Sequence, residues 1–185
     1  MDYHIWTKIF DLMTIDDISK ITQVSHDLED CVKNIVLTAP LFKCYHMENI
    51  SQYRNLVKLT CERTDIETLS GFPNLTYVNI FDCKLLTKID KLPNITWLMC
   101  QCCQCLVSIN DTPNLRGIKL EYCDHIKNIA NLEKITYFSC RYCNTFLSDN
   151  IENMAQLTHL YSDDKNIGNI RAFFIQIRTL ISISF

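Results

Sequence analysis

Residues Leu75 to Leu85 read LTYVNIFDCKL, with apolar side chains or cysteine at positions that include 75, 78, 80, 83 and 85. Val78 and Ile80 are two residues apart, as in a strand that points alternate side chains to one side. Cys83 follows Ile80 by three residues, where a turn would end the strand. The stretch therefore predicts a short strand with an inward-facing apolar side, followed by a turn and a return segment.

The same pattern recurs through most of the chain at intervals of about twenty residues. Segments that begin at residues 55, 74, 94, 114, 134 and 156 can be aligned, and we number positions from the first residue of each. Apolar residues, cysteine among them, fall at positions 2, 5 and 7. The tenth position holds a cysteine in four consecutive segments: Cys83, Cys103, Cys123 and Cys143. One such unit cannot bury its apolar side alone, so neighbouring units must stack and share a core.

The segment LTYVNIFDCKL resembles the leucine-rich repeat signature L-x-x-L-x-L-x-x-N/C-x-L at every defining position. The resemblance implies a thin, curved solenoid with a parallel sheet on its concave face. About twenty residues per repeat leave little room for a helix on the other side, so we expect extended or 3₁₀ return segments there.

The solenoid is predicted to span residues 37–185, with about six repeats and a C-terminal cap. Residues 37–53 fit a degenerate first repeat. Near the other end, Leu180, Ile183 and Phe185 restart the strand spacing and predict a closing strand. Before them, residues 170–177 carry apolar side chains at helical spacing and predict a short capping helix.

The first 36 residues follow a different pattern, which predicts three short helices. Apolar residues recur at helical spacing between Ile5 and Met13, and Thr14, Asp16 and Ser25 are candidate caps for the next two helices. Helices this short can bury little by themselves. We therefore expect them to dock on the solenoid, on a partner protein, or on both.

This N-terminal pattern resembles an F-box. Ile9 and its neighbours match the first F-box helix, Asp17 and Ile18 match its D-L step, and residues 24–28 match its V-S-R-x-W stretch. Two features depart from that family: Met1-Asp2 stands where Leu-Pro is usual, and Leu28 replaces the tryptophan. The resemblance implies that these helices bind a Skp-type adaptor through Ile5, Ile9, Phe10, Leu12, Met13, Ile18 and Val24.

An F-box followed by leucine-rich repeats resembles a substrate receptor of a cullin-RING ubiquitin ligase. The composition and compact build also resemble F-box/repeat proteins of giant DNA viruses. The overall expectation is an α+β solenoid that acts as a non-catalytic recruiting subunit, a monomer within a larger complex. A stand-alone repeat scaffold, whose N-terminal helices only cap the stack, is the alternative. The catalytic C-terminal domain of repeat-bearing bacterial ubiquitin ligases has no counterpart after the last repeat.

Positions 4, 6, 8 and 9 of each segment flank the buried strand positions and are expected to line the concave face. Aromatic side chains and methionine are concentrated there, and such residues are favoured at the energetic centres of protein interfaces. Trp97 lies in the middle repeat beside Gly117, where a gap is expected to form a pocket. The predicted target-binding residues are Tyr77, Phe81, Trp97, Met99, Tyr122, Tyr137, Tyr142 and Tyr161.

The eleven cysteines include two C-x-x-C pairs, which begin at Cys100 and Cys140. These pairs belong to segments two repeats apart, about 10 Å in a stack of strands, and zinc–sulfur bonds near 2.3 Å cannot span that distance. We therefore expect buried packing and no metal site. The cysteines at position 10 form a ladder along the predicted stack. Adjacent members of this ladder are close enough in principle for disulfides, which a reducing compartment disfavours. Cys102 is expected to face outward.

Bulk properties limit the function classes further. The net charge of −3 and the absence of a basic run give no nucleic-acid footprint. No apolar stretch is long enough to span a membrane, and no signal peptide pattern is present. Three glycines exclude a glycine-rich phosphate loop. These features predict a cytoplasmic protein (host cytoplasm if viral) that needs no cofactor.

Overall fold

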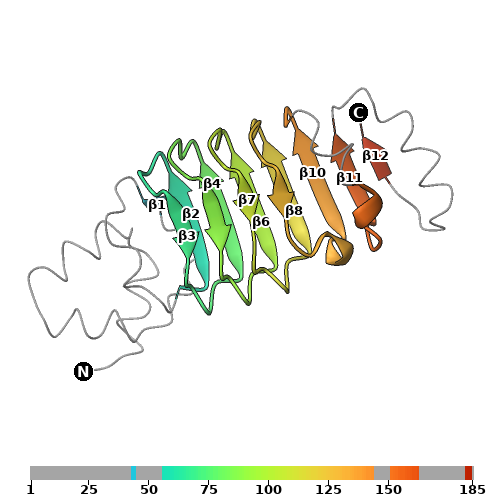
Figure 1. The fold of residues 1–185 in the computed structure, drawn as a ribbon, viewed down its shortest axis with the longest axis horizontal. Helices are drawn as coiled ribbons and strands as arrows, with labels where there is room; N and C mark the ends of the chain where they lie inside the picture. Colours follow the sequence, from blue (N-terminus) through green and yellow to red (C-terminus); the bar gives the residue numbers. More distant parts are fainter. Residues whose placement is uncertain (1–42, 45–55, 144–150, 163–181, 185) are drawn as a thin grey trace, which may run out of the picture.

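The computed structural model describes residues 43–44, 56–143, 151–162 and 182–184, which form a parallel β-solenoid (Figure 1). Each central coil gives one strand to a large sheet and one to a small sheet. The large sheet contains, in spatial order, β1 (Lys43–Cys44), β2 (Lys58–Glu62), β4 (Tyr77–Phe81), β6 (Trp97–Gln101), β8 (Gly117–Glu121), β10 (Tyr137–Arg141), β11 (His159–Ser162) and β12 (Ser182–Ser184). The small sheet contains β3 (Thr68–Ser70), β5 (Lys88–Asp90), β7 (Ser108–Ile109) and β9 (Asn128–Ile129).

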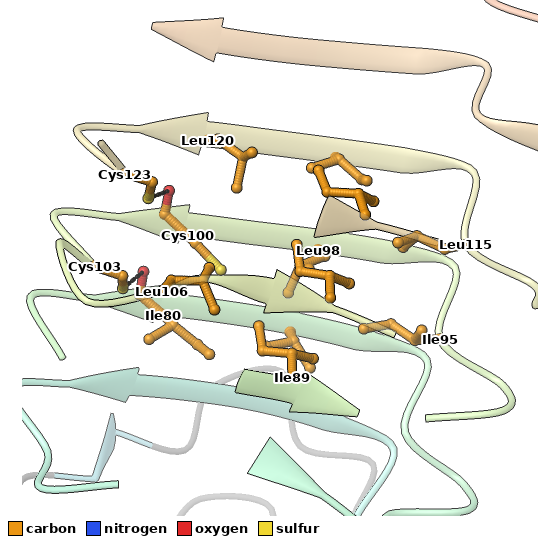
Figure 2. Packing of buried hydrophobic residues seen from close by; sticks show 14 of the residues in the cluster. Ile80, Ile89, Ile95, Leu98, Cys100, Cys103, Leu106, Leu115, Leu120 and Cys123 are labelled. Carbon is orange, nitrogen blue, oxygen red and sulfur yellow. Dashed lines mark hydrogen bonds between the residues drawn. The ribbon is translucent and has the colours of Figure 1, made fainter. Parts of the chain in front are cut away.

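Return segments are extended or 3₁₀, as the short repeat predicts. The strands of the small sheet provide them in the central coils, and their arrows run opposite to those of the large sheet (Figures 1 and 2). Two 3₁₀ turns, Leu132–Lys134 and Ile151–Asn153, lie on the return side of the later coils. No α-helix occurs within the described ranges. Nor do these ranges contain a helix with the length and apolarity needed to cross a membrane.

The register of the large sheet follows the repeat. Tyr77 pairs with Trp97, Trp97 with Gly117, and Gly117 with Tyr137, all in parallel. Each repeat position therefore forms a column that runs along the solenoid. Columns at odd and even positions face opposite sides of the sheet, because side chains alternate along a strand.

The core lies between the two sheets (Figure 2). Residues at repeat positions 2 and 5 are buried in every aligned segment, as predicted. At position 7 the residue is also buried in every segment, but the last segment carries Ser162 there rather than an apolar residue. The position-5 column contains Leu59, Val78, Leu98, Ile118, Phe138 and Leu160.

The cysteines take the packing roles predicted for them. Cys100 and Cys140 are buried at position 7, and the four cysteines at position 10 are buried as well. Their thiols donate to the backbone: Cys103 Sγ lies 3.4 Å from the Gln101 carbonyl, and Cys123 Sγ lies 3.5 Å from that of Cys100. Figure 2 shows the second of these bonds, which joins one coil to the preceding one. The cysteine column therefore closes the turns after β4, β6, β8 and β10.

The residue at position 9 has a left-handed backbone in five consecutive coils, with φ between 51° and 56°. Left-handed geometry is unfavourable for residues with a side chain. Here it aims the amide N–H at the next coil: Asp82 N donates to the Gln101 carbonyl at 2.9 Å, and Cys102 N to that of Glu121 at 2.8 Å. The position-9 side chains are consequently displayed at the edge of the sheet.

The ends of the described solenoid match two predictions. In β12, Ile183 pairs with Leu160, so a strand does close the stack. At the other end β1, which lies within residues 37–53, pairs with β2 through Lys43 and Thr60. The predicted helices of residues 1–36 and 170–177 lie outside the described residues.

Candidate protein-binding face

The outer face of the large sheet, opposite the core, carries all eight predicted target-binding residues. Five of them are half-buried on the strands, and Phe81 is exposed at the end of β4. Tyr122 and Tyr142 are exposed at position 9, in the turns that follow β8 and β10. The structure divides most of these side chains into a central aromatic strip and an edge pair.

The aromatic strip consists of Trp97, Tyr137, His159 and Tyr161. The ring centroids of Trp97 and Tyr137 are 4.8 Å apart, and those of Tyr137 and Tyr161 are 5.5 Å apart. His159 lies 6.1 Å from Tyr137 and was not among the predicted aromatic residues. Its place at position 4, one coil beyond Tyr137, predicted that it lines this face, but only aromatic residues and methionine were chosen as target-binding residues. Neighbouring rings support one another, so the strip is held in place before any partner binds.

The prediction of a pocket beside Trp97 is wrong, because the indole itself occupies the space above Gly117. A Cβ atom built on Gly117 would lie 2.1 Å from Cε3 of Trp97. Glycine is therefore required for the ring to lie across β8 and reach Tyr137 on β10. The face presents a continuous aromatic strip at this point, not a hole that a partner side chain could enter.

The edge pair consists of Tyr122 and Tyr142, whose rings stack at 4.5 Å with an interplanar angle of 11°. Their exposed fractions are 47% and 55%. Cys102 precedes Tyr122 in the same column and is partly exposed, in line with the outward orientation predicted for it. Stacked, exposed tyrosines offer a large contact area with few rotatable bonds, which lowers the entropic cost of binding.

The carboxylates of this face are paired with cations. Glu121 accepts a hydrogen bond from Gln101. It also forms an ion pair with Lys119, whose Nζ lies 3.1 Å from Oε1 of Glu121. Near the N-terminal end of the sheet, Arg63 contacts the carboxylates of Asp82 at 3.3 Å and Glu62 at 3.7 Å. These pairs lie along or between adjacent strands, so the repeat register places their members together.

Two cations of the same face have no such partner. Lys58 on β2 and Arg141 on β10 are exposed, and neither forms an ion pair with any of the described residues. Among the described residues, the uncompensated charge of the outer face is therefore positive, although the whole chain has a net charge of −3.

Two tyrosines of the face, Tyr122 and Tyr137, have a raised pKa and stay neutral near neutral pH. Burial, with a smaller contribution from Tyr161, raises the pKa of Tyr137. Burial also raises the pKa of Tyr122, helped by its stacked neighbour Tyr142. Each phenol can therefore donate or accept a hydrogen bond at the rim of an aromatic contact.

The interior thiols do not form a metal centre. Among the described side chains, no three Cys, His, Asp or Glu residues are grouped so that they could hold a metal ion. Shared hydrogen bonding with Cys103, followed by burial, raises the pKa of Cys100 and of Cys123. The same hydrogen bonds lower the pKa of Cys103.

The predicted adaptor-binding residues cannot be placed. They all fall in residues 1–36, outside the described ranges: Ile5, Ile9, Phe10, Leu12, Met13, Ile18 and Val24. Their proposed role rests on the sequence pattern.

Comparison with known proteins adds no relative. No family model, no curated protein and no solved structure matches this chain. The outer face and the sequence pattern of the N-terminal segment are therefore the grounds for a functional proposal.

Proposed function

We propose that this protein is a non-catalytic recruiting subunit of a ubiquitin ligase. In this proposal the outer face of the large sheet binds a target protein, and the N-terminal segment binds a Skp-type adaptor in the cytoplasm. The aromatic strip across β6, β10 and β11 is the observation that carries the target-binding half. Residues 1–36 support the adaptor half through their resemblance to an F-box.

The strip supports protein binding because its aromatic side chains are partly exposed and do not pack in the core. Position 4 of these strands faces away from the core, which is filled by the residues at positions 2, 5 and 7. Exposed aromatic area of this kind is favoured at protein interfaces and is disfavoured on a surface that contacts only water. Polar groups such as Gln101 and Lys119 lie on the same face, on β6 and β8, as in the rim of an interface.

Adaptor binding can be tested with the full chain and a purified Skp-type adaptor. We expect wild-type protein to bind at micromolar concentration, and we expect the double variant Ile9→Asp/Leu12→Asp to lose binding by about a hundredfold or more, because buried apolar anchors dominate such interfaces. Isothermal calorimetry measures the affinity, and circular dichroism checks that the β-solenoid remains folded.

Leu85→Asp is a matched control, since it changes an equally apolar residue that is 49% exposed on the solenoid. It should bind the adaptor as wild type does. If wild-type protein binds no Skp-type adaptor, the adaptor half of the proposal is wrong, and a stand-alone repeat scaffold remains.

A further inference from the structure

Among its described residues, the outer face combines the aromatic strip with two unpaired cations, Lys58 on β2 and Arg141 on β10. Every described carboxylate of this face, by contrast, is paired with a cation. A partner that brought further cations would leave Lys58 and Arg141 unpaired and repelled. A partner that brought carboxylates would neutralise them, and charge complementarity of this kind selects among partners.

The positions of the two cations define a geometry. β2 and β10 are separated by the strands β4, β6 and β8, and Lys58 and Arg141 occupy positions 4 and 8 of their segments. Strand spacing of about 4.8 Å and a rise of about 3.3 Å per residue place their Cα atoms about 23 Å apart on a diagonal. An extended segment of about seven residues spans this distance.

Met99 lies at the midpoint of this diagonal. It occupies position 6 of β6, two strands and two repeat positions from each cation, and its side chain is half-buried. Trp97 lies on the same strand, two residues away, with its ring extended across Gly117. Methionine adapts its shape and makes favourable sulfur contacts with aromatic rings, so the centre of the diagonal is suited to an aromatic side chain.

We infer that the target segment recognised by this face is an extended acidic peptide, with a carboxylate near each end and an aromatic residue between them. The inference rests on the proposed function, because it names the class of target that the outer face recruits. A nucleic-acid strand fits this face less well. Its phosphates recur every few ångströms and would need cations along the whole path, whereas only two cations are unpaired among the described residues of this face.

Fluorescein-labelled peptides of about seven residues test the inference by fluorescence anisotropy, since that length spans the diagonal. One peptide carries glutamate at both ends and phenylalanine in the middle. A second has lysine at both ends, and a third keeps the glutamates but replaces phenylalanine with serine. We expect the full-length protein to bind the first peptide about tenfold or more tightly than either of the others.

Charge reversal on the protein is the complementary arm. Arg141→Glu should weaken binding of the glutamate–phenylalanine peptide by about tenfold and should improve binding of the lysine peptide. Lys127→Glu is the matched control, because Lys127 is an exposed lysine immediately before β9 of the small sheet. It should leave the affinity unchanged.

The inference is overturned if the lysine peptide binds as well as the glutamate peptide, or if none of the peptides binds. Equal effects of Arg141→Glu and Lys127→Glu would also overturn it, since they would show a response to net charge alone. Each of these results leaves adaptor binding intact. A failure of the adaptor experiment, conversely, does not alter the peptide preference of the face, so the two proposals fail separately.

Discussion

The two sides of the large sheet are built from alternate residues of the same strands but follow different rules. In β6, Leu98 and Cys100 are fully buried, whereas Trp97, Met99 and Gln101 are partly exposed on the other side. Along the inner columns one coil repeats the next, with Leu, Ile, Val, Phe or Cys at almost every level. The outer columns do not repeat: position 4 changes from tyrosine to tryptophan, glycine, tyrosine and histidine.

This difference separates what stacking requires from what it leaves open. An inner residue contacts the equivalent residues of the coils on both sides, so a close-packed column restricts its size and polarity. An outer residue is open to solvent on one side and is restricted less, although the ring of Trp97 limits the size of Gly117. Variation there combined with exposed aromatic groups therefore indicates a specific surface, and variation combined with small polar groups would indicate a solvated one.

The largest expected difference between buried and exposed positions concerns thiol reactivity. Cys103 is fully buried in the ladder, and Cys105 is exposed two residues later. A buried thiol reacts with iodoacetamide only when the structure opens, so Cys103 should be alkylated on the order of a thousandfold more slowly than Cys105. Peptide mass spectrometry after timed labelling of the native protein measures both rates. Equal rates would show that the cysteine ladder is open to solvent.

The inner side could be predicted from the sequence because the same positions are buried in every repeat. A period of about twenty residues assigns the burial of positions 2, 5, 7 and 10 without knowledge of any neighbour. Ser162 is buried at position 7 as well, but it is polar where the pattern predicts an apolar residue. The outer side could be predicted only as a set of residues. The indole of Trp97 lies over Gly117 because of a side-chain rotation that depends on the space in the next coil. Periodicity carries no information about that rotation.

Ion pairing on the outer side is partly accessible to sequence reasoning. Lys119 and Glu121 are two residues apart on one strand, and Gln101 and Glu121 occupy the same position one repeat apart, so both contacts follow once the register is known. The unpaired state of Arg141 could not be read in this way, because it depends on the conformations of all the acidic neighbours.

Core truncation is expected to have the next largest effect. Leu98 is fully buried in the position-5 column between Val78 and Ile118. Leu98→Ala should lower the free energy of unfolding by about 2–5 kcal/mol, because the neighbouring coils cannot collapse into the space that the side chain leaves. Urea denaturation followed by circular dichroism measures the change. A loss below that of Trp97→Ala would contradict the assignment of inner and outer sides.

Trp97→Ala should affect binding more than stability. The ring is half-buried and contacts Tyr137, so we expect a stability loss of about 1 kcal/mol from the lost aromatic contact. Binding of the glutamate–phenylalanine peptide should weaken about tenfold, since a central aromatic residue is removed from the interface. Fluorescence anisotropy and urea denaturation on the same variant separate the two effects. A variant that loses stability but keeps its full affinity would exclude the aromatic strip from the binding site.

The smallest change in stability is expected for a substitution at Gly117, the outer-face residue that lies under the ring of Trp97. Gly117→Ala adds a Cβ atom 2.1 Å from Cε3 of Trp97, so the indole must rotate away from β8 and from Tyr137. The lost ring contact costs about 0.5–1.5 kcal/mol, whereas replacement of glycine by alanine within a strand contributes about 0.5–1 kcal/mol of stability. The net change should therefore stay within about 1 kcal/mol.

In a Trp6→Phe background, where Trp97 is the remaining tryptophan, its emission should shift to longer wavelength as the ring becomes more exposed. The decisive measurement is a double-mutant cycle: in the Trp97→Ala background no ring opposes the new methyl group, so Gly117→Ala should become stabilising. If Gly117→Ala has the same effect in both backgrounds, the indole does not occupy the space above Gly117, and the aromatic strip is interrupted at β8.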